Sequence, residues 1–234
     1  MAPSDQIAAA EAVQLPFMAK FGLWLPASFV AAAGGGPAVD GRLRAAEQAF
    51  VNAPDITACA GTGPDAQAVA ARSNLLPADV HDQRVVQVAG PTVFQIVDVI
   101  EIGTSKLEQL IKLQEQRAAL DGPVDPLPSA RSRPRAKPAG DDWVAKVMCK
   151  LLLRDVLGRH FWAIEQLPVG GVSVDMCLRT KIVVSGVTVA RGVLFLKPTN
   201  AEMHFPAGDE PVRQRLDRTI ARLATDVAGL RSGQ

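Results

Sequence analysis

The segment Thr180-Lys181-Ile182-Val183-Val184-Ser185-Gly186, continued by Val187 through Leu196, decides the fold class. Valine, isoleucine and threonine dominate both halves, and apolar residues alternate with small or polar ones. This composition and period are typical of β-strands. We therefore predict strands over 180–185 and 187–196, joined near Gly186, with a bulge or bend at Gly192.

The same alternation recurs upstream of this segment. It predicts three more strands, over 92–100, 144–154 and 159–165. In the second of them Lys146, Lys150 and Arg154 share one face. After the last strand, residues 210–231 carry apolar side chains at three- and four-residue steps, which predicts an amphipathic helix. Five strands followed by a helix favour a small Greek-key barrel of the OB-fold type.

The N-terminal third of the chain has a helical period instead. We predict helices at 6–20, from Pro26 to Ala33, at 41–51 and at 64–72, followed by an irregular Leu75-Leu76-Pro77 segment. The fold class is thus α+β. A small helical bundle over 1–80 precedes an OB-fold domain over 81–234.

About forty residues separate the first two predicted strands, far more than an ordinary connection needs. In this insertion, 103–142, Ser105 and Glu108 form a capping-box pattern that predicts the start of a helix. The helix carries a narrow apolar stripe of Leu107, Leu110, Ile111 and Leu120. The second half of the insertion is rich in proline and carries Arg131, Arg133, Arg135 and Lys137, a composition that cannot bury a core.

The net charge of +1 conceals an uneven distribution along the 234 residues. Residues 1–100 carry 5 basic and 9 acidic residues, which gives −4, whereas residues 101–234 carry 20 and 15, which gives +5. The basic part suggests a partner for the C-terminal region. Three scattered cysteines and the lack of a long apolar segment predict a soluble intracellular protein with no membrane contact.

Signatures of catalysis are missing from the sequence. His81, His160 and His204 lie far apart and share no metal-ligand spacing with one another or with the cysteines. The segment Gly103-Thr104-Ser105-Lys106 lacks the order of a phosphate-binding loop. We expect a non-enzymatic protein with no catalytic residue, metal site or cofactor.

The ordered set of features resembles the N-terminal region of the RecQ-mediated genome instability protein 1 family. The closest stretches are Thr180 to Gly186 and Arg191-Gly192-Val193-Leu194-Phe195-Leu196-Lys197-Pro198-Thr199-Asn200. Support comes from Phe94 to Val99, from Ala163-Ile164-Glu165 and from Leu75-Leu76-Pro77. Ala163 and Thr199 stand where the family pattern has glycine and glutamate, so the relationship is distant. The chain is similar to the short members with a single barrel, and a second small OB-fold subunit is therefore not expected.

This resemblance implies a nuclear scaffold subunit for a type IA topoisomerase, topoisomerase III, and a RecQ-family helicase. In the family, the loop inserted in the barrel reaches into the topoisomerase gate and favours decatenation and dissolution of double Holliday junctions. The residues that the resemblance and the insertion assign to the topoisomerase interface are Lys197, Pro198, Leu107, Leu110, Ile111 and Trp143. The basic residues Arg131, Arg133, Arg135 and Lys137 would contact DNA within the complex, with weak DNA binding by the chain alone.

Two alternatives stay open at this stage. The first is a Tudor-family partner of topoisomerase III beta, which has a shorter insertion. The second is an independent single-stranded DNA-binding protein. The predicted barrel strands contain only Phe94, Phe161, Trp162 and Phe195 as aromatic residues, and some of these must fill the core, which disfavours stacking of bases.

Overall fold

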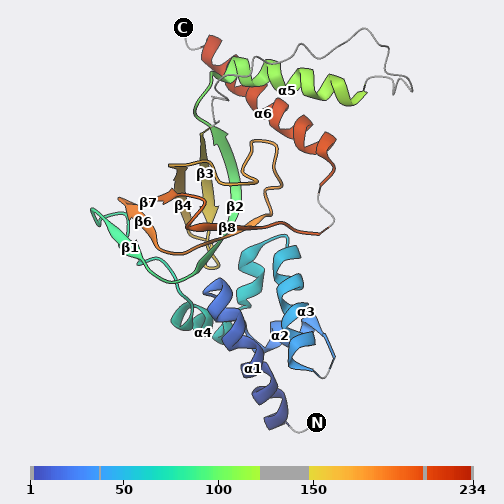
Figure 1. Cartoon of the computed structure of the whole chain (residues 1–234), viewed down its shortest axis with the longest axis vertical. Coiled ribbons are helices and arrows are strands. Elements are labelled where there is room, and N and C mark those ends of the chain that lie inside the picture. The colour runs from blue at the N-terminus through green and yellow to red at the C-terminus, as the bar shows by residue number, and fades with distance from the viewer. Residues whose placement is uncertain (1–2, 37, 122–147, 208–209, 233–234) are drawn as a thin grey trace, which may run out of the picture. The chain divides into compact units, whose positions relative to one another are not determined.

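The computed structural model describes residues 3–36, 38–121, 148–207 and 210–232 (Figure 1). The described residues fall into two compact units. Met1–Ile102 and Met148–Glu210 form the first, and Gly103–Val147 and Pro211–Gln234 form the second. Both predicted domains contribute residues to the first unit, and the domain boundary at residue 80 stays a prediction.

The N-terminal part of the first unit is helical, as predicted. Pro26 precedes the second helix at its N-cap, and Gly34 ends that helix with a positive φ of 77°. Asp55 caps a short 3-10 helix that the sequence pattern did not reveal, since its side chain accepts a hydrogen bond from the N–H of Thr57. The helices are α1 (Pro3–Phe21), α2 (Ala27–Ala33), α3 (Val39–Asn52), η1 (Ile56–Ala60) and α4 (Pro64–Arg72).

The rest of the first unit is one curled, mixed sheet. Its strands are β1 (Val86–Val88), β2 (Thr92–Glu101), β3 (Cys149–Arg154), β4 (His160–Glu165), β5 (Lys181–Val184), β6 (Val187–Ala190), β7 (Val193–Leu196) and β8 (Ala201–His204). The order is β1-β6-β7-β4-β3-β2-β5-β8, with β4 and β7 parallel. Only Ser185 and Gly186 separate β5 from β6, although four strands lie between them in this order. The sheet must therefore curl back on itself, which is consistent with the predicted OB-fold.

One predicted strand is wrong. Residues 187–196 form two antiparallel strands, β6 and β7, joined by a two-residue turn at Arg191 and Gly192. Both turn residues have positive φ, 48° and 76°, which is the backbone of a tight hairpin turn rather than of a bulge. The predicted count of five strands missed the additional strands β1 and β8 at the two ends of the order.

Two apolar clusters hold the first unit together. The barrel core is formed by inward side chains of the strands, including Phe94, Leu151, Phe161 and Ile182. The second cluster centres on the rings of Phe17, Phe21 and Phe50, whose centroids lie 4.5–5.2 Å apart. It also includes Val93, Val156 and Val183 from the barrel part, so the helices pack directly on the outside of the barrel.

The second unit contains two helices, α5 (Lys106–Asp121) and α6 (Val212–Ser232), which lie side by side (Figure 1). Lys106 pairs with Asp226 at 2.7 Å, and Arg117 pairs with Asp217 at 2.6 Å. The early residue of one helix thus meets the late residue of the other, so the helices are antiparallel. The buried apolar residues of the pair are Leu110, Leu113, Leu216 and Leu223.

Candidate interaction sites

The predicted interface residues Lys197 and Pro198 lie in a well-defined turn after β7. The N–H of Lys197 donates to Asn200 Oδ1 at 2.7 Å, and Asn200 Nδ2 donates to the carbonyl oxygen of Phe195 at 3.1 Å. These bonds fix the turn locally, because an Asn side chain takes the place of a backbone partner. Both predicted residues are exposed, which leaves the Lys197 ammonium and the Pro198 ring accessible to a partner.

A groove of about 460 Å³ begins at this turn. One wall comes from the end of α1 and the other from the turn and β8. Its lining consists of Ala19, Lys20, Pro91, Val183, Ser185, Pro198, Thr199, Asn200, Ala201 and Glu202. Helical and barrel residues therefore form this surface together, within the first unit.

The apolar stripe predicted on the insertion helix is buried only in part. Leu110 is buried together with Leu113, whereas Leu107 and Ile111 are 46% and 49% exposed. The helix begins as predicted, with the N–H of Glu108 donating to Ser105 Oγ at 3.2 Å. Leu110 is therefore a packing residue, and Leu107 and Ile111 remain as apolar side chains available to a partner.

The predicted sites do not all fall in one compact unit. Lys197 and Pro198 belong to the first unit, and Leu107, Leu110 and Ile111 belong to the second. Trp143 and the basic residues Arg131, Arg133, Arg135 and Lys137 lie outside the described residues. Their assigned roles stay predictions.

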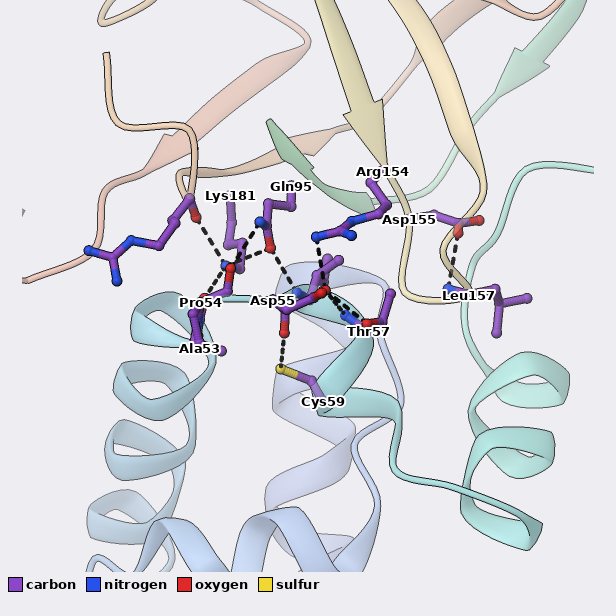
Figure 2. A network of polar contacts seen from close by, with 12 residues as sticks. Ala53, Pro54, Asp55, Thr57, Cys59, Gln95, Arg154, Asp155, Leu157 and Lys181 are labelled. Carbon is purple, nitrogen blue, oxygen red and sulfur yellow. Dashed lines mark hydrogen bonds and ion pairs between the residues drawn. The ribbon is translucent and has the colours of Figure 1, made fainter. Parts of the chain in front are cut away.

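A buried polar network that sequence reasoning missed joins the helices to the barrel (Figure 2). Lys181, the second residue of the segment quoted first, is fully buried at the start of β5. Its ammonium donates to the carbonyl oxygens of Ala53 at 2.6 Å and Arg179 at 3.0 Å, and to Gln95 Oε1 at 3.2 Å. The three donors of the group are thus satisfied by three acceptors, as a buried ammonium requires.

Gln95 and Arg154 extend the network from β2 and β3 to the segment between α3 and η1 (Figure 2). The amide of Gln95 donates to the carbonyl oxygen of Pro54 at 3.1 Å and accepts from the N–H of Ile56 at 2.7 Å. Arg154 pairs with Asp55 at 3.0 Å. Three neighbouring strands therefore hold one short stretch of backbone, which otherwise would lack partners for its polar groups.

Burial governs the electrostatics of this network. Loss of hydration lowers the pKa of Lys181 from 10.5 to about 8, even though nearby Asp55 favours the charged form. Burial by itself would raise the pKa of Asp55, but hydrogen bonds from Thr57 and the charges of Arg154 and Lys181 bring it below its ordinary value. At neutral pH the network therefore contains charged Lys181, Arg154 and Asp55.

A signal for Lys181 was present in the sequence. The alternation in 181–184 places Ile182 and Val184 on one face and Lys181 and Val183 on the other. Ile182 and Val184 fill the barrel core, whereas Val183 joins the cluster formed with the helices. A lysine beside a valine on the second buried face predicts a buried cation, but only once the strand is known to be covered on both sides.

The described residues offer neither a metal site nor a membrane-spanning helix. No group of three or more His, Cys, Asp or Glu side chains in this part of the chain is arranged to hold a metal ion. Across the same residues, no helix has the length and apolar character needed to cross a membrane.

Comparison with known proteins relates the chain to a protein family and to a curated relative. The family model described as "RMI1, N-terminal OB-fold domain" matches residues 76–204, more than half of the chain. The protein named RecQ-mediated genome instability protein 1 of Schizosaccharomyces pombe is 33% identical over 138 residues. That alignment covers 53% of this chain and 59% of the relative.

Proposed function

The chain belongs to the family of the RMI1 N-terminal OB-fold domain, and on that premise we propose that it is a non-catalytic scaffold that serves genome stability. Its proposed partners are a topoisomerase III and a RecQ-family helicase, and its proposed role is to promote decatenation and dissolution of double Holliday junctions in the nucleus. The family resemblance inferred from the sequence is confirmed by both comparisons.

The name of the relative ties that protein to RecQ-mediated genome instability. The alignment spans 59% of the relative. The activity and partners of the whole relative are therefore assigned to this chain only as part of the proposal. An OB-fold with no group of His, Cys, Asp or Glu arranged to hold a metal ion among its described residues is compatible with a binding role.

One observation carries the proposed topoisomerase contact. Helix α5 follows β2 directly in sequence, and it keeps Leu107 and Ile111 about half exposed although Leu110 between them is buried. Leu107 and Ile111 are separated by one helical turn, so they form a short apolar strip on one side of α5. A strip of this kind is suited to a hydrophobic groove on a partner protein.

The first unit supplies a second proposed contact at Lys197 and Pro198. The exposed turn after β7 presents the Lys197 ammonium beside the groove that starts at Pro198. The basic residues Arg131, Arg133, Arg135 and Lys137 complete the proposal as contacts to DNA phosphates in the assembled complex.

The test is a pull-down of purified topoisomerase III by the full chain and by two matched variants. The double variant Leu107→Ser with Ile111→Ser removes the apolar strip, and we expect at least tenfold weaker binding, since a few central apolar residues dominate such interfaces. Leu120→Ser is the control, because Leu120 is 51% exposed on the same helix but lies nine residues beyond Ile111, away from the strip. It should bind as the wild type does.

The outcomes separate the parts of the proposal. No binding of topoisomerase III alpha or beta by the wild-type chain would refute the scaffold role. Equal losses in both serine variants would refute the strip as a specific contact. Residues 105–140 can also be deleted. If the dissolution of double Holliday junctions is then unchanged, the inserted segment is not needed for this activity.

A further inference from the structure

Strand β8 lies at one end of the sheet, and the described pairings give it a single neighbour, β5 (Figure 1). The N–H of Ser185 donates to the carbonyl oxygen of Asn200 at 3.0 Å, so these residues form a hydrogen-bonded pair of the antiparallel ladder. Hydrogen-bonded and non-hydrogen-bonded pairs alternate in such a ladder. The backbone of Glu202 therefore bonds to β5, whereas Ala201 and Met203 direct their N–H and C=O groups away from β5.

The register of β5 with its other neighbour, β2, supports this assignment. The N–H of Ile96 donates to the carbonyl oxygen of Thr180 at 2.9 Å, so by the same alternation Ile182 bonds to β2 and Val183 bonds to β8. The hydrogen bonds between described residues leave the outward backbone groups of β8 without a partner. These groups form an open sheet edge, to which a further strand can pair.

Two hollows accompany this edge. The groove beside the turn after β7, of about 460 Å³, is lined by Ala201 and Glu202 among others. A second hollow, of about 380 Å³, is lined by His204 and by Phe205, which is 48% exposed. Lys20, near the end of α1, borders both hollows. Space for an extended peptide therefore follows β8 from its first residue to its last.

The centre of the edge carries a negative charge. The side chain of Glu202 is 70% exposed, and its ion-pair partner among the described residues is His204, whose Nε2 lies 3.3 Å away. Burial lowers the pKa of His204 from 6.5, so its ring is neutral at neutral pH. Lys20, on the opposite wall of the groove, pairs with Glu47 at 2.8 Å. A strand that binds along β8 therefore meets a carboxylate whose charge is not compensated.

This charge determines which strand fits the edge. If β8 paired over its whole length with β8 of a second copy, Ala201 would pair with Met203 of that copy, and the two Glu202 side chains would face each other. Like charges directly opposite are destabilising, whereas a lysine or arginine opposite Glu202 forms a favourable pair. The side chains of Ala201 and Met203 lie on the other face, partly buried against the barrel core, where apolar residues would extend the packing. The edge therefore favours a strand with a basic residue between two apolar residues.

From this arrangement we propose that β8 binds an extended segment of a partner protein as an added antiparallel strand. The segment has a lysine or arginine opposite Glu202 and apolar residues opposite Ala201 and Met203. Main-chain hydrogen bonds to Ala201 and Met203 supply the affinity, and the alternating side chains supply the specificity. Such binding goes beyond the proposed function, since it requires neither the apolar strip of α5 nor a topoisomerase.

The probe is the synthetic peptide acetyl-Thr-Val-Lys-Val-Thr-amide, titrated into the isotope-labelled full chain and followed by NMR. We expect the amide signals of Ala201 and Met203 to shift and their hydrogen exchange to slow, because both N–H groups gain acceptors. The N–H groups of Glu202 and His204 already bond to β5 and serve as the internal reference. Methylation of the two valine nitrogens, which face β8, should weaken binding by about tenfold or more, whereas methylation of the lysine nitrogen, which faces away, should leave it unchanged.

Variants of the chain test the charge and the backbone separately. Glu202→Lys should weaken binding of this peptide about two- to fivefold and favour a peptide with glutamate in place of lysine. Glu115→Lys is the matched control, because Glu115 is exposed on α5 in the second unit, and it should bind as the wild type does. Ala201→Pro removes one outward N–H at the first residue of an edge strand, where proline is tolerated. It should weaken binding about fivefold and leave the thermal unfolding temperature near that of the wild type.

Three results would each refute the added strand. The first is that the peptide at millimolar concentration shifts no amide signal of β8. The second is that the peptide methylated on its valines binds as well as the peptide methylated on its lysine. The third is that Glu202→Lys and Glu115→Lys bind the lysine peptide equally well. The methylated peptides give this answer on the wild-type chain, so it does not depend on the folding of any variant.

Discussion

Lys181 Nζ lies 2.6 Å from the carbonyl oxygen of Ala53, a residue 128 positions earlier in the chain. The contact joins the first residue of β5 to the segment that leaves α3. The segment Thr180 to Gly186, which carries the family resemblance, therefore contains a residue that holds the helices on the barrel. Its role is in assembly of the first unit, since a fully buried side chain cannot reach a partner.

Replacement of Lys181 by methionine should destabilise the first unit by about 2–4 kcal/mol. The variant keeps most of the side-chain volume but leaves the carbonyl oxygens of Ala53 and Arg179 without their donor, and buried unsatisfied acceptors are costly. Urea unfolding measures the change. Lys197→Met is the matched control, because Lys197 is exposed, and its effect should stay within about 0.5 kcal/mol. Equal effects would contradict the assigned role.

The stabilities of the wild type and of Lys181→Met should depend differently on pH. Folded Lys181 loses its proton near pH 8, whereas the unfolded chain keeps it up to about 10.5. Between these values the unfolded state binds more protons, so the free energy of unfolding rises with pH. The difference in this free energy between wild type and Lys181→Met should grow by about 1 kcal/mol from pH 8 to about pH 9.

The ionisation of cysteines also makes the stability of the protein depend on pH. The prediction therefore concerns the difference in free energy of unfolding between wild type and Lys181→Met. Burial raises the pKa of Cys59 to about 11 and that of Cys149 to about 12. The unfolded thiols ionise first, so these groups reduce stability as the pH rises above about 9. Both proteins contain them, so the contribution of Cys149 cancels, and that of Cys59 cancels except for the part by which the charge of Lys181 lowers the pKa of Cys59. A constant difference across the pH range would show that Lys181 is not desolvated as described.

Local patterns predicted most elements because each depends on neighbours in sequence. The helix at Pro64–Arg72 has proline at its first position, and the helix at Lys106–Asp121 has its cap at Ser105, so both starts were predictable. The hairpin at Arg191 and Gly192 was missed because a single apolar run fits both a bent strand and two strands with a tight turn. The two interpretations are distinguished only by strand pairing, in which β6 pairs with β1 and β7 pairs with β4.

The candidate sites were less predictable because they depend on contacts between distant segments. Periodicity placed Leu107, Leu110 and Ile111 on one stripe, but their division into buried and exposed residues follows from the packing of the second unit. In the same way, composition counted Phe94, Phe161, Trp162 and Phe195 together. The register of the paired strands decides which two rings point outward.

Asp155 organises the turn between β3 and β4 and gives a third prediction. It is buried and accepts hydrogen bonds from the N–H groups of Leu157 and Arg159, at 3.0 and 2.9 Å, and from Arg159 Nε at 2.7 Å. Asp155→Ala should therefore cost about 2–4 kcal/mol in urea unfolding, since a charge-assisted bond and two backbone bonds are lost. The exposed Asp79→Ala is the control. A similar stability for both variants would contradict this role.

The glycines on either side of β6 should respond unequally to alanine. Gly186 and Gly192 both have positive φ, 62° and 76°, so each substitution costs about 1–2 kcal/mol in backbone strain. At Gly186 the new Cβ meets no atom within 4 Å, whereas at Gly192 it overlaps the ring of His81. That ring is stacked on Phe161, with centroids 5.6 Å apart, so its displacement would cost this ring contact. Thermal unfolding should therefore show a clearly larger loss for Gly192→Ala than for Gly186→Ala. Equal losses would mean that the ring of His81 moves away freely and that backbone strain alone sets the cost at both turns.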